Sequence, residues 1–135
     1  MTNSPPLIYS FVMDGDDIER EKMQRSLCVE MKADYTAAPP EWVSGFASQT
    51  KGRTPLNGLR HPAAPGTTGW YLWCGEDSSE AKDFYQPLHT KHLYEYFPLA
   101  AKLLGLPPGY RFLLAGEYLD VWFDPKLTEG ERDVE

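Results

Sequence analysis

Cysteine, positive charge and long apolar runs are all scarce in this sequence. Its 135 residues contain two cysteines, Cys28 and Cys74, and no C-x-x-C pair, which excludes a disulfide-rich scaffold and zinc-finger spacing. Lys and Arg total 13 against 20 Asp and Glu, so the formal net charge is −7. Because binding to nucleic acid requires clustered cations, nucleic acid is a disfavoured partner. We expect two buried reduced thiols, with a Cys28–Cys74 bridge as the alternative.

The apolar stretches are shorter than a membrane span, and the N-terminal residues lack a cationic leader. These observations predict a cytoplasmic location and no membrane partner. Hydrophobic residues make up 41% of the chain, enough for a core and too many for a wholly disordered acidic protein. We expect three regions: an N-terminal arm over residues 1–13 with a short edge strand through Ile8, Phe11 and Val12, one domain over residues 14–126, and an acidic flexible tail over residues 127–135.

Two segments have the pattern of helices. The first begins near Asp16, ends before Pro39, and carries an apolar stripe of Met23, Leu27 and Met31 with Cys28 beside it. The second covers residues 90–104 and is interrupted by Pro98, which can stand as the first residue of a further helix or as a kink. Gly105 stands where a left-handed residue would end that helix.

Three segments predict strands. Residues 42–47 form a short apolar segment, and residues 70–74 have apolar groups on both alternating faces, as a central strand requires. Residues 110–123 predict a hairpin around Gly116-Glu117, with Arg111 opposite Trp122. The fold class that follows is α+β, a single compact domain with a mainly antiparallel β-sheet and helices packed on it.

Residues 51–69 are rich in proline and glycine and are locally basic through Lys51, Arg53 and Arg60. Such a composition predicts a long irregular loop, with a turn at Asn57-Gly58. Long ordered loops often carry function, so this loop is a candidate for a role in binding.

Signals for catalysis or cofactor binding are weak. His89 and His92 are three residues apart near a helix start, with Glu95 three further on, and His61 lies in the proline-rich segment. This spacing permits a metal site or a general base but lacks any known hydrolase signature. Neither phosphate-binding glycine motif occurs. We therefore predict no enzyme activity, no cofactor and no metal.

Acidic residues dominate the second part of the chain. Two groups stand out, one following the predicted central strand and one in the hairpin: Glu76, Asp77, Glu80 and Asp83, and Glu117 and Asp120. One interpretation is a solvated surface that keeps a small protein soluble. The other is a binding patch that attracts a partner with a basic surface.

A series of motifs resembles a known bacterial family. These are PLNGLRHP at residues 55–62, GWYLWCGE at 69–76, PLHTKHL at 87–93, LGLPPGYRFL at 104–113 and DVWFD at 120–124. Over roughly residues 40–125 the chain resembles immunity family thirty-three of the polymorphic toxin systems, formerly a domain of unknown function. The initial helix and the acidic tail lie outside this resemblance.

The resemblance implies a small cytosolic, non-enzymatic protein that is encoded beside a secreted toxin and protects its producer by binding that toxin. Many such toxins are nucleases with cationic channels, so the resemblance favours a nuclease effector with type VI or contact-dependent delivery, blocked by occlusion of its active site. The acidic residues are then the predicted toxin contacts. Two alternatives stay open: a small metal-dependent hydrolase using His61, His89 or His92, and a regulatory binding module with no toxin partner.

Overall fold

The computed structural model describes residues 15–81 and 83–133, so the predicted N-terminal arm and its edge strand lie outside the described residues. The elements follow in this order: α2 Gly15–Met31, β1 Val43–Phe46, η1 Ser48–Thr50, β2 Leu56–Arg60, β3 Thr67–Cys74, β4 Gln86–His89, α3 Thr90–Tyr96, η2 Pro98–Gly105, β5 Tyr110–Ala115, β6 Tyr118–Phe123 and α4 Lys126–Asp133.

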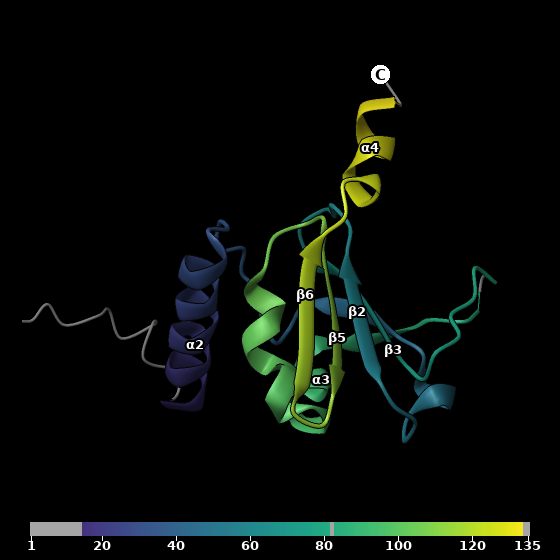
Figure 1. The fold of residues 1–135 in the computed structure, drawn as a ribbon, viewed down its shortest axis with the longest axis horizontal. Helices are drawn as coiled ribbons and strands as arrows, with labels where there is room; N and C mark the ends of the chain where they lie inside the picture. The colour runs from purple at the N-terminus through teal and green to yellow at the C-terminus, as the bar shows by residue number, and fades with distance from the viewer. Residues whose placement is uncertain (1–14, 82, 134–135) are drawn as a thin grey trace, which may run out of the picture.

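The six strands form one sheet in the order β4-β1-β3-β2-β5-β6. The pair β1–β3 is parallel, and the other four neighbouring pairs are antiparallel. The segment η2 packs against the sheet, and α2 lies on the far side of η2 (Figure 1). The predicted α+β fold, a mainly antiparallel sheet with helices packed on it, is confirmed, and β3 occupies the interior of the sheet as predicted.

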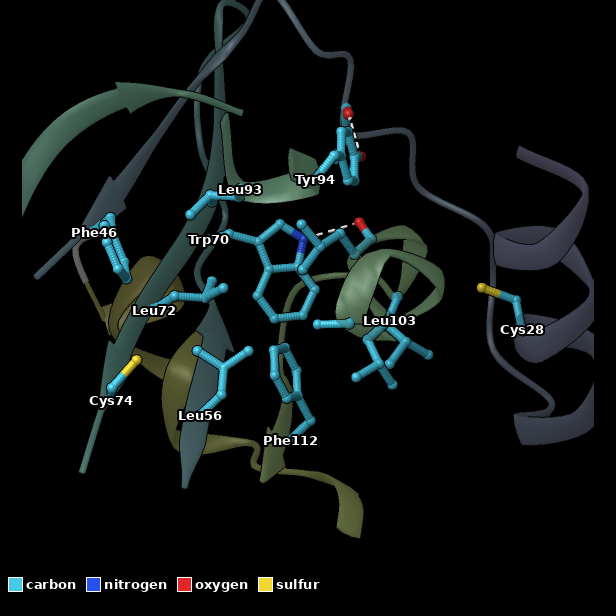
Figure 2. Packing of buried hydrophobic residues seen from close by; sticks show 14 residues of the cluster. Cys28, Phe46, Leu56, Trp70, Leu72, Cys74, Leu93, Tyr94, Leu103 and Phe112 are labelled. Atoms are coloured by element: carbon cyan, nitrogen blue, oxygen red, sulfur yellow. Dashed lines mark hydrogen bonds between the residues drawn. The ribbon is translucent and has the colours of Figure 1, made fainter. Parts of the chain in front are cut away.

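The core lies between the sheet and η2. The indole of Trp70 is fully buried there, donates a hydrogen bond from Nε1 to the Leu104 carbonyl at 2.9 Å, and lies 5.6 Å from the Phe112 ring (Figure 2). Cys28 and Cys74 are both buried free thiols. Burial raises the pKa of both thiols, which disfavours the reactive thiolate. We therefore assign packing roles to both cysteines.

The prediction of an irregular loop over residues 51–69 is wrong in part, because that segment contains β2 and the start of β3. Pro55 and Gly58 occupy positions that a sheet tolerates. Pro55 precedes the first residue of β2, and Gly58 faces the Phe112 ring so closely that a Cβ there would lie 2.3 Å from a ring carbon. The predicted Asn57-Gly58 turn is therefore a strand whose glycine makes room for a core aromatic ring.

Arg60 does not contribute to a basic surface, since only 2% of it is exposed. Its guanidinium donates hydrogen bonds to five carbonyl oxygens at 2.7 to 3.2 Å, those of Thr36, Ala37, Thr68, Leu104 and Leu106. Burial lowers the pKa of Arg60 to about 10. The side chain thus joins β2, β3, the end of η2 and the segment after α2 at one point.

The hairpin has the predicted register. Ala115 pairs with Tyr118 and Arg111 pairs with Trp122, and Gly116 has the positive φ of 60° that a first turn residue of this kind requires. Pro98 begins η2 after α3 ends at Tyr96, as one of the two alternatives for this proline predicted.

One local prediction about the helices is wrong, and a second is right only in part. Gly105 is not among the glycines with positive φ and instead ends η2, where a Cβ would lie 2.8 Å from the Cβ of Gln24. Close packing of α2 on η2, rather than a left-handed cap, therefore requires this glycine. In α2, Cys28 is buried and Leu27 and Met31 pack against the core as predicted. Met23 is instead 43% exposed, and Gln24, which was outside the predicted stripe, is buried.

Within the predicted acidic tail, residues 126–133 form α4 (Figure 1). The Asp124 carboxylate accepts a hydrogen bond from the Lys126 backbone N–H at 3.1 Å, and the Thr128 hydroxyl donates to the Pro125 carbonyl. Asp124 followed by Pro125 is a helix start signal that low apolar content obscured.

Candidate partner-binding surface

One face of the sheet is turned away from η2 and carries partly exposed aromatic side chains. Residues that pair directly across strands point to the same face. Tyr71 pairs with Leu59, Leu59 with Arg111, and Arg111 with Trp122, so one row of side chains crosses four strands. We call this surface the open face and define it by Tyr71 and Trp73 of β3, Leu59 of β2, Arg111 and Leu113 of β5, and Tyr118, Asp120 and Trp122 of β6.

An aromatic cluster covers the β3 side of the open face. The Tyr85 ring lies 5.1 Å from the Tyr71 ring and 6.3 Å from the Trp73 ring, and the His61 ring lies 5.6 Å from Tyr71. Burial raises the pKa of Tyr85 to about 12. Beside the cluster is a cavity of about 270 Å³ lined in part by His61, Tyr71 and Tyr85. The cavity lies at the margin of the open face and is about large enough to hold one side chain.

Arg111 and Trp122 form the β6 side of the open face. The guanidinium lies 5.7 Å from the Trp122 ring centroid and donates a hydrogen bond from a terminal nitrogen to Asp124 at 3.1 Å. Within residues 15–81 and 83–133, the buried side-chain polar atoms that lack a hydrogen-bond partner are Arg111 Nε and Trp73 Nε1. Both belong to open-face side chains, and such unsatisfied donors are uncommon in native proteins.

The six predicted acidic contacts are all exposed: Glu76, Asp77, Glu80, Asp83, Glu117 and Asp120. The four ion pairs of the described chain use other acidic residues, namely Asp17, Glu21, Glu95 and Asp124. The charge of the six carboxylates is therefore not neutralised by any ion pair within the part of the chain that the structure describes.

The structure places these six residues in two neighbouring groups rather than in one cluster. Cys74 at the end of β3 pairs with Leu56, and Leu56 pairs with Leu114 near the end of β5. Connection 75–85 and the hairpin turn therefore leave the same end of the sheet, two strands and about 10 Å apart. The Arg53 side chain lies against Gly75 at the start of the connection.

The two acidic groups lie at different places relative to the open face. Connection 75–85 projects from the side of the sheet away from α2 (Figure 1). Asp120 pairs with Leu113 and lies on the open face itself. The surface that results is an aromatic and apolar sheet face with acidic residues on it and along one end.

The three histidines have separate surroundings in the part of the chain that the structure describes. His92 Nδ1 lies 3.3 Å from the Glu95 carboxylate, His89 is exposed before α3, and His61 Nδ1 lies 3.4 Å from the Leu127 carbonyl. Across the described residues, no group of three or more His, Cys, Asp or Glu side chains is placed to hold a metal ion.

Sequence reasoning missed part of this surface. Leu59 lies in the segment that the sequence predicts to be a loop, and no strand pattern surrounds Tyr85, so the sequence singles out neither residue. The sequence of β2 is LNGLR, in which Leu56 and Leu59 are three residues apart and so face opposite sides of the strand. No alternating apolar pattern therefore reveals Leu59. No local signal places Tyr85 on Tyr71, because that contact depends on how connection 75–85 returns to β4.

A family model for the Imm33-like domain matches residues 23–124, which is most of the chain. The chain belongs to the Imm33-like domain family. This confirms the resemblance found from the motifs, and the match begins within α2, earlier than residue 40. Membership in the Imm33-like family indicates an immunity protein, implies binding to a cognate toxin and favours a non-enzymatic role.

No curated protein and no solved structure matches the Imm33-like chain. Among the described residues, none of the helices combines the length and the hydropathy required to cross a membrane.

Proposed function

We propose that this Imm33-like protein neutralises a cognate secreted toxin by binding a basic surface of the toxin and covering its active site. The observation that carries the proposal is that Glu76, Asp77, Glu80 and Asp83 are all exposed and form no ion pair within the described chain. Acidic residues that stay unpaired cost a protein little in water and attract a cationic partner over a long range.

The toxin class that this charge favours is a nuclease. A nuclease binds a polyanion and therefore needs cationic side chains around its active site. A protein with a net charge of −7 and an exposed acidic connection is complementary to such a site. Binding there excludes the nucleic acid substrate directly, so inhibition requires no chemistry by the immunity protein. Delivery of the toxin by a type VI or contact-dependent route belongs to the same proposal.

The open face supplies the apolar part of the proposed interface. Tyr71 and Trp122 are each 37% exposed and Tyr118 is 61% exposed. Aromatic side chains are enriched where proteins bind proteins, since they bury a large area with little loss of conformational entropy. Acidic residues at the margin then determine the rate and the choice of partner, and the aromatic row contributes to the lifetime of the complex.

Co-expression tests the proposal directly. The gene encoded beside this protein is expressed alone and together with it, and cell survival and nucleic acid integrity are measured. We expect the neighbour alone to kill cells with degradation of DNA or RNA, and co-expression to restore growth. A harmless neighbour contradicts the immunity function, and a lethal neighbour that leaves nucleic acids intact contradicts the nuclease class.

Charge reversal tests the acidic connection. Asp77→Lys with Glu80→Lys is expected to lower the association rate constant for the purified toxin by about tenfold at low salt, because steering contributes factors of about 10 to 10³. Glu30→Lys with Asp34→Lys is the matched control, since it makes the same change in net charge at exposed positions on and after α2. Equal effects of the two double variants would show that only net charge matters and would reject the connection as a contact.

A further inference from the structure

We infer that the free edge of β6 binds an extended segment of the toxin as a seventh strand of the sheet. The inference rests on the proposed function and adds to it the form of the partner. In the described chain β6 is the last strand of the sheet, with β5 on one side and no strand on the other. An open edge of this kind presents unpaired backbone N–H and C=O groups, which a second chain can pair with.

The two edges of the sheet differ in how well they are protected. The other edge strand, β4, has four residues and contains Pro87, which lacks a backbone N–H. β6 has six residues with the sequence YLDVWF, which contains neither proline nor lysine and has one charge, that of Asp120. Proteins usually protect an edge with proline, lysine or a short strand. β6 lacks all three protections.

The hairpin geometry determines which backbone groups of β6 are free. The residues that flank a two-residue turn form a hydrogen-bonded pair, here Ala115 and Tyr118. Alternate residues then bond to β5, so Asp120 and Trp122 also do, and the Asp124 N–H continues this pattern by donating to the Gly109 carbonyl at 2.7 Å. The backbone groups that point outward are consequently those of Leu119, Val121 and Phe123.

The side chains of β6 determine which residues a toxin segment paired with its free edge would need. Leu119 and Val121 pack partly buried against the core, so apolar residues of an added strand would extend the core on that face. Asp120 lies on the open face between Tyr118 and Trp122, so a Lys or Arg of the added strand would pair with it. The partner is thus a segment of alternating apolar and polar residues with a cation at the position opposite Asp120.

Charge selects the toxin over a second copy of this chain as the occupant of the edge. Two copies would each bring a net charge of −7, and each would bring an acidic β6. A toxin with a basic surface, as the proposed function requires, removes that repulsion and supplies the cation for Asp120.

Amide hydrogen exchange, followed by NMR on the full chain with and without the purified toxin, tests the inference. We expect the amides of Leu119, Val121 and Phe123 to exchange rapidly in the free chain and at least about 100-fold more slowly in the complex. A complex that forms while these three amides stay unprotected overturns the inference and leaves the proposed function intact. Protection already present in the free chain overturns it too, because a second copy or residues 1–14 then cover the edge. The absence of any complex defeats the proposed function itself.

A proline substitution provides the second test. Val121→Pro removes an outward N–H without removing a hydrogen bond to β5, so edge pairing is blocked while the hairpin keeps its ladder. We expect this variant to bind the toxin at least about tenfold more weakly. Val121→Thr, which keeps the N–H and a similar shape, is the matched control and should bind within about threefold of the native chain. Equal binding by the proline variant, shown by circular dichroism to be folded, would overturn the inference.

Discussion

At the scale of single residues, β2 shows how tertiary contacts determine what a residue does. Arg60 reads in sequence as part of a basic stretch, yet its five carbonyl partners make it an internal crosslink. Backbone carbonyl oxygens accept these hydrogen bonds through their partial negative charges, so the guanidinium donors are satisfied without a carboxylate. Gly58 reads as a turn, yet it is a strand residue under Phe112. Neither role has a local signature, since each depends on residues distant in sequence.

Arg60→Met should lower the free energy of unfolding by about 3 kcal/mol or more, because several buried carbonyls would lose their donors. Arg60→Lys should recover only part of this, since an ammonium has three donors and cannot reach all five carbonyls. Urea unfolding at neutral pH measures both variants. A loss below about 1 kcal/mol for Arg60→Met would show that water replaces the guanidinium and that the crosslink adds little.

Gly58→Ala should destabilise the protein by about 2 kcal/mol or more, because the new methyl group would overlap the Phe112 ring. Gly15→Ala is the control, as nothing lies within 4 Å of a Cβ at that position. Thermal unfolding should show a clear decrease in Tm for the first variant and almost no change for the second. Similar values for both would mean that Phe112 moves aside at no cost.

The raised pKa of Tyr85 predicts that the free energy of unfolding falls at alkaline pH. Its pKa is raised to about 12 in the folded protein, from about 10 in an unfolded chain, so the folded state holds the proton more tightly. The resulting stabilisation is complete below pH 10 and is lost as the pH rises from about 10 to 12. Between pH 9 and pH 11 the native protein should lose about 1 kcal/mol more than Tyr85→Phe, a comparison in which other titrating groups cancel. Parallel losses would show that Tyr85 is solvated.

At the scale of elements, α2 attaches to the rest of the fold through polar contacts. Gln24, which is 2% exposed, donates from Nε2 to the Tyr94 hydroxyl at 3.1 Å and to the Ala101 carbonyl at 2.9 Å. One turn later, the Cys28 thiol donates to the Gly105 carbonyl at 3.3 Å. The stripe predicted from sequence gives the correct helix and includes Cys28, Leu27 and Met31, which lie in or against the core, but it misses Gln24. A buried glutamine was not expected, since amides are mostly exposed.

Gln24→Ala should lower the free energy of unfolding by about 2 kcal/mol, because it leaves the Ala101 carbonyl without this donor and opens a cavity. The amides of α2 should also exchange faster, since the helix is released locally. Ser26→Ala, at an exposed position of the same helix, is the control. If exchange in α2 does not change, other contacts hold the helix on η2.

At the scale of the whole molecule, the acidic residues differ in whether an ion pair neutralises them. Part of the acidic charge is neutralised in ion pairs such as Asp17–Arg20 and Asp124–Arg111, whereas connection 75–85 keeps its charge exposed at one end of the sheet. Helix α2 lies on one side of the sheet, and the acidic connection projects from the other (Figure 1). Under the proposed function, this asymmetry would orient an approaching toxin with a basic surface.

Association with the toxin should therefore depend on ionic strength. Between 50 and 500 mM NaCl, the association rate constant of the native protein should fall about tenfold, because the Debye length falls below the separation at which steering acts. The dissociation rate constant should change less, since the aromatic contacts are insensitive to salt. Surface plasmon resonance measures both constants, and a salt-independent association rate would contradict electrostatic steering by the acidic groups.

The sequence by itself determined the features that depend on neighbours along the chain. The register of the 110–123 hairpin follows from a two-residue turn with glycine first, the break at Pro98 follows from a missing N–H, and the family follows from an ordered series of motifs. Only the tertiary structure decided that β2 is a strand, that β1 and β3 pair in parallel, and that the acidic connection and the hairpin turn share one end of the sheet. Those features arise from contacts between distant segments, and their energy comes from burial of Trp70 and Phe112 and from the carbonyls gathered around Arg60, none of which a local pattern encodes.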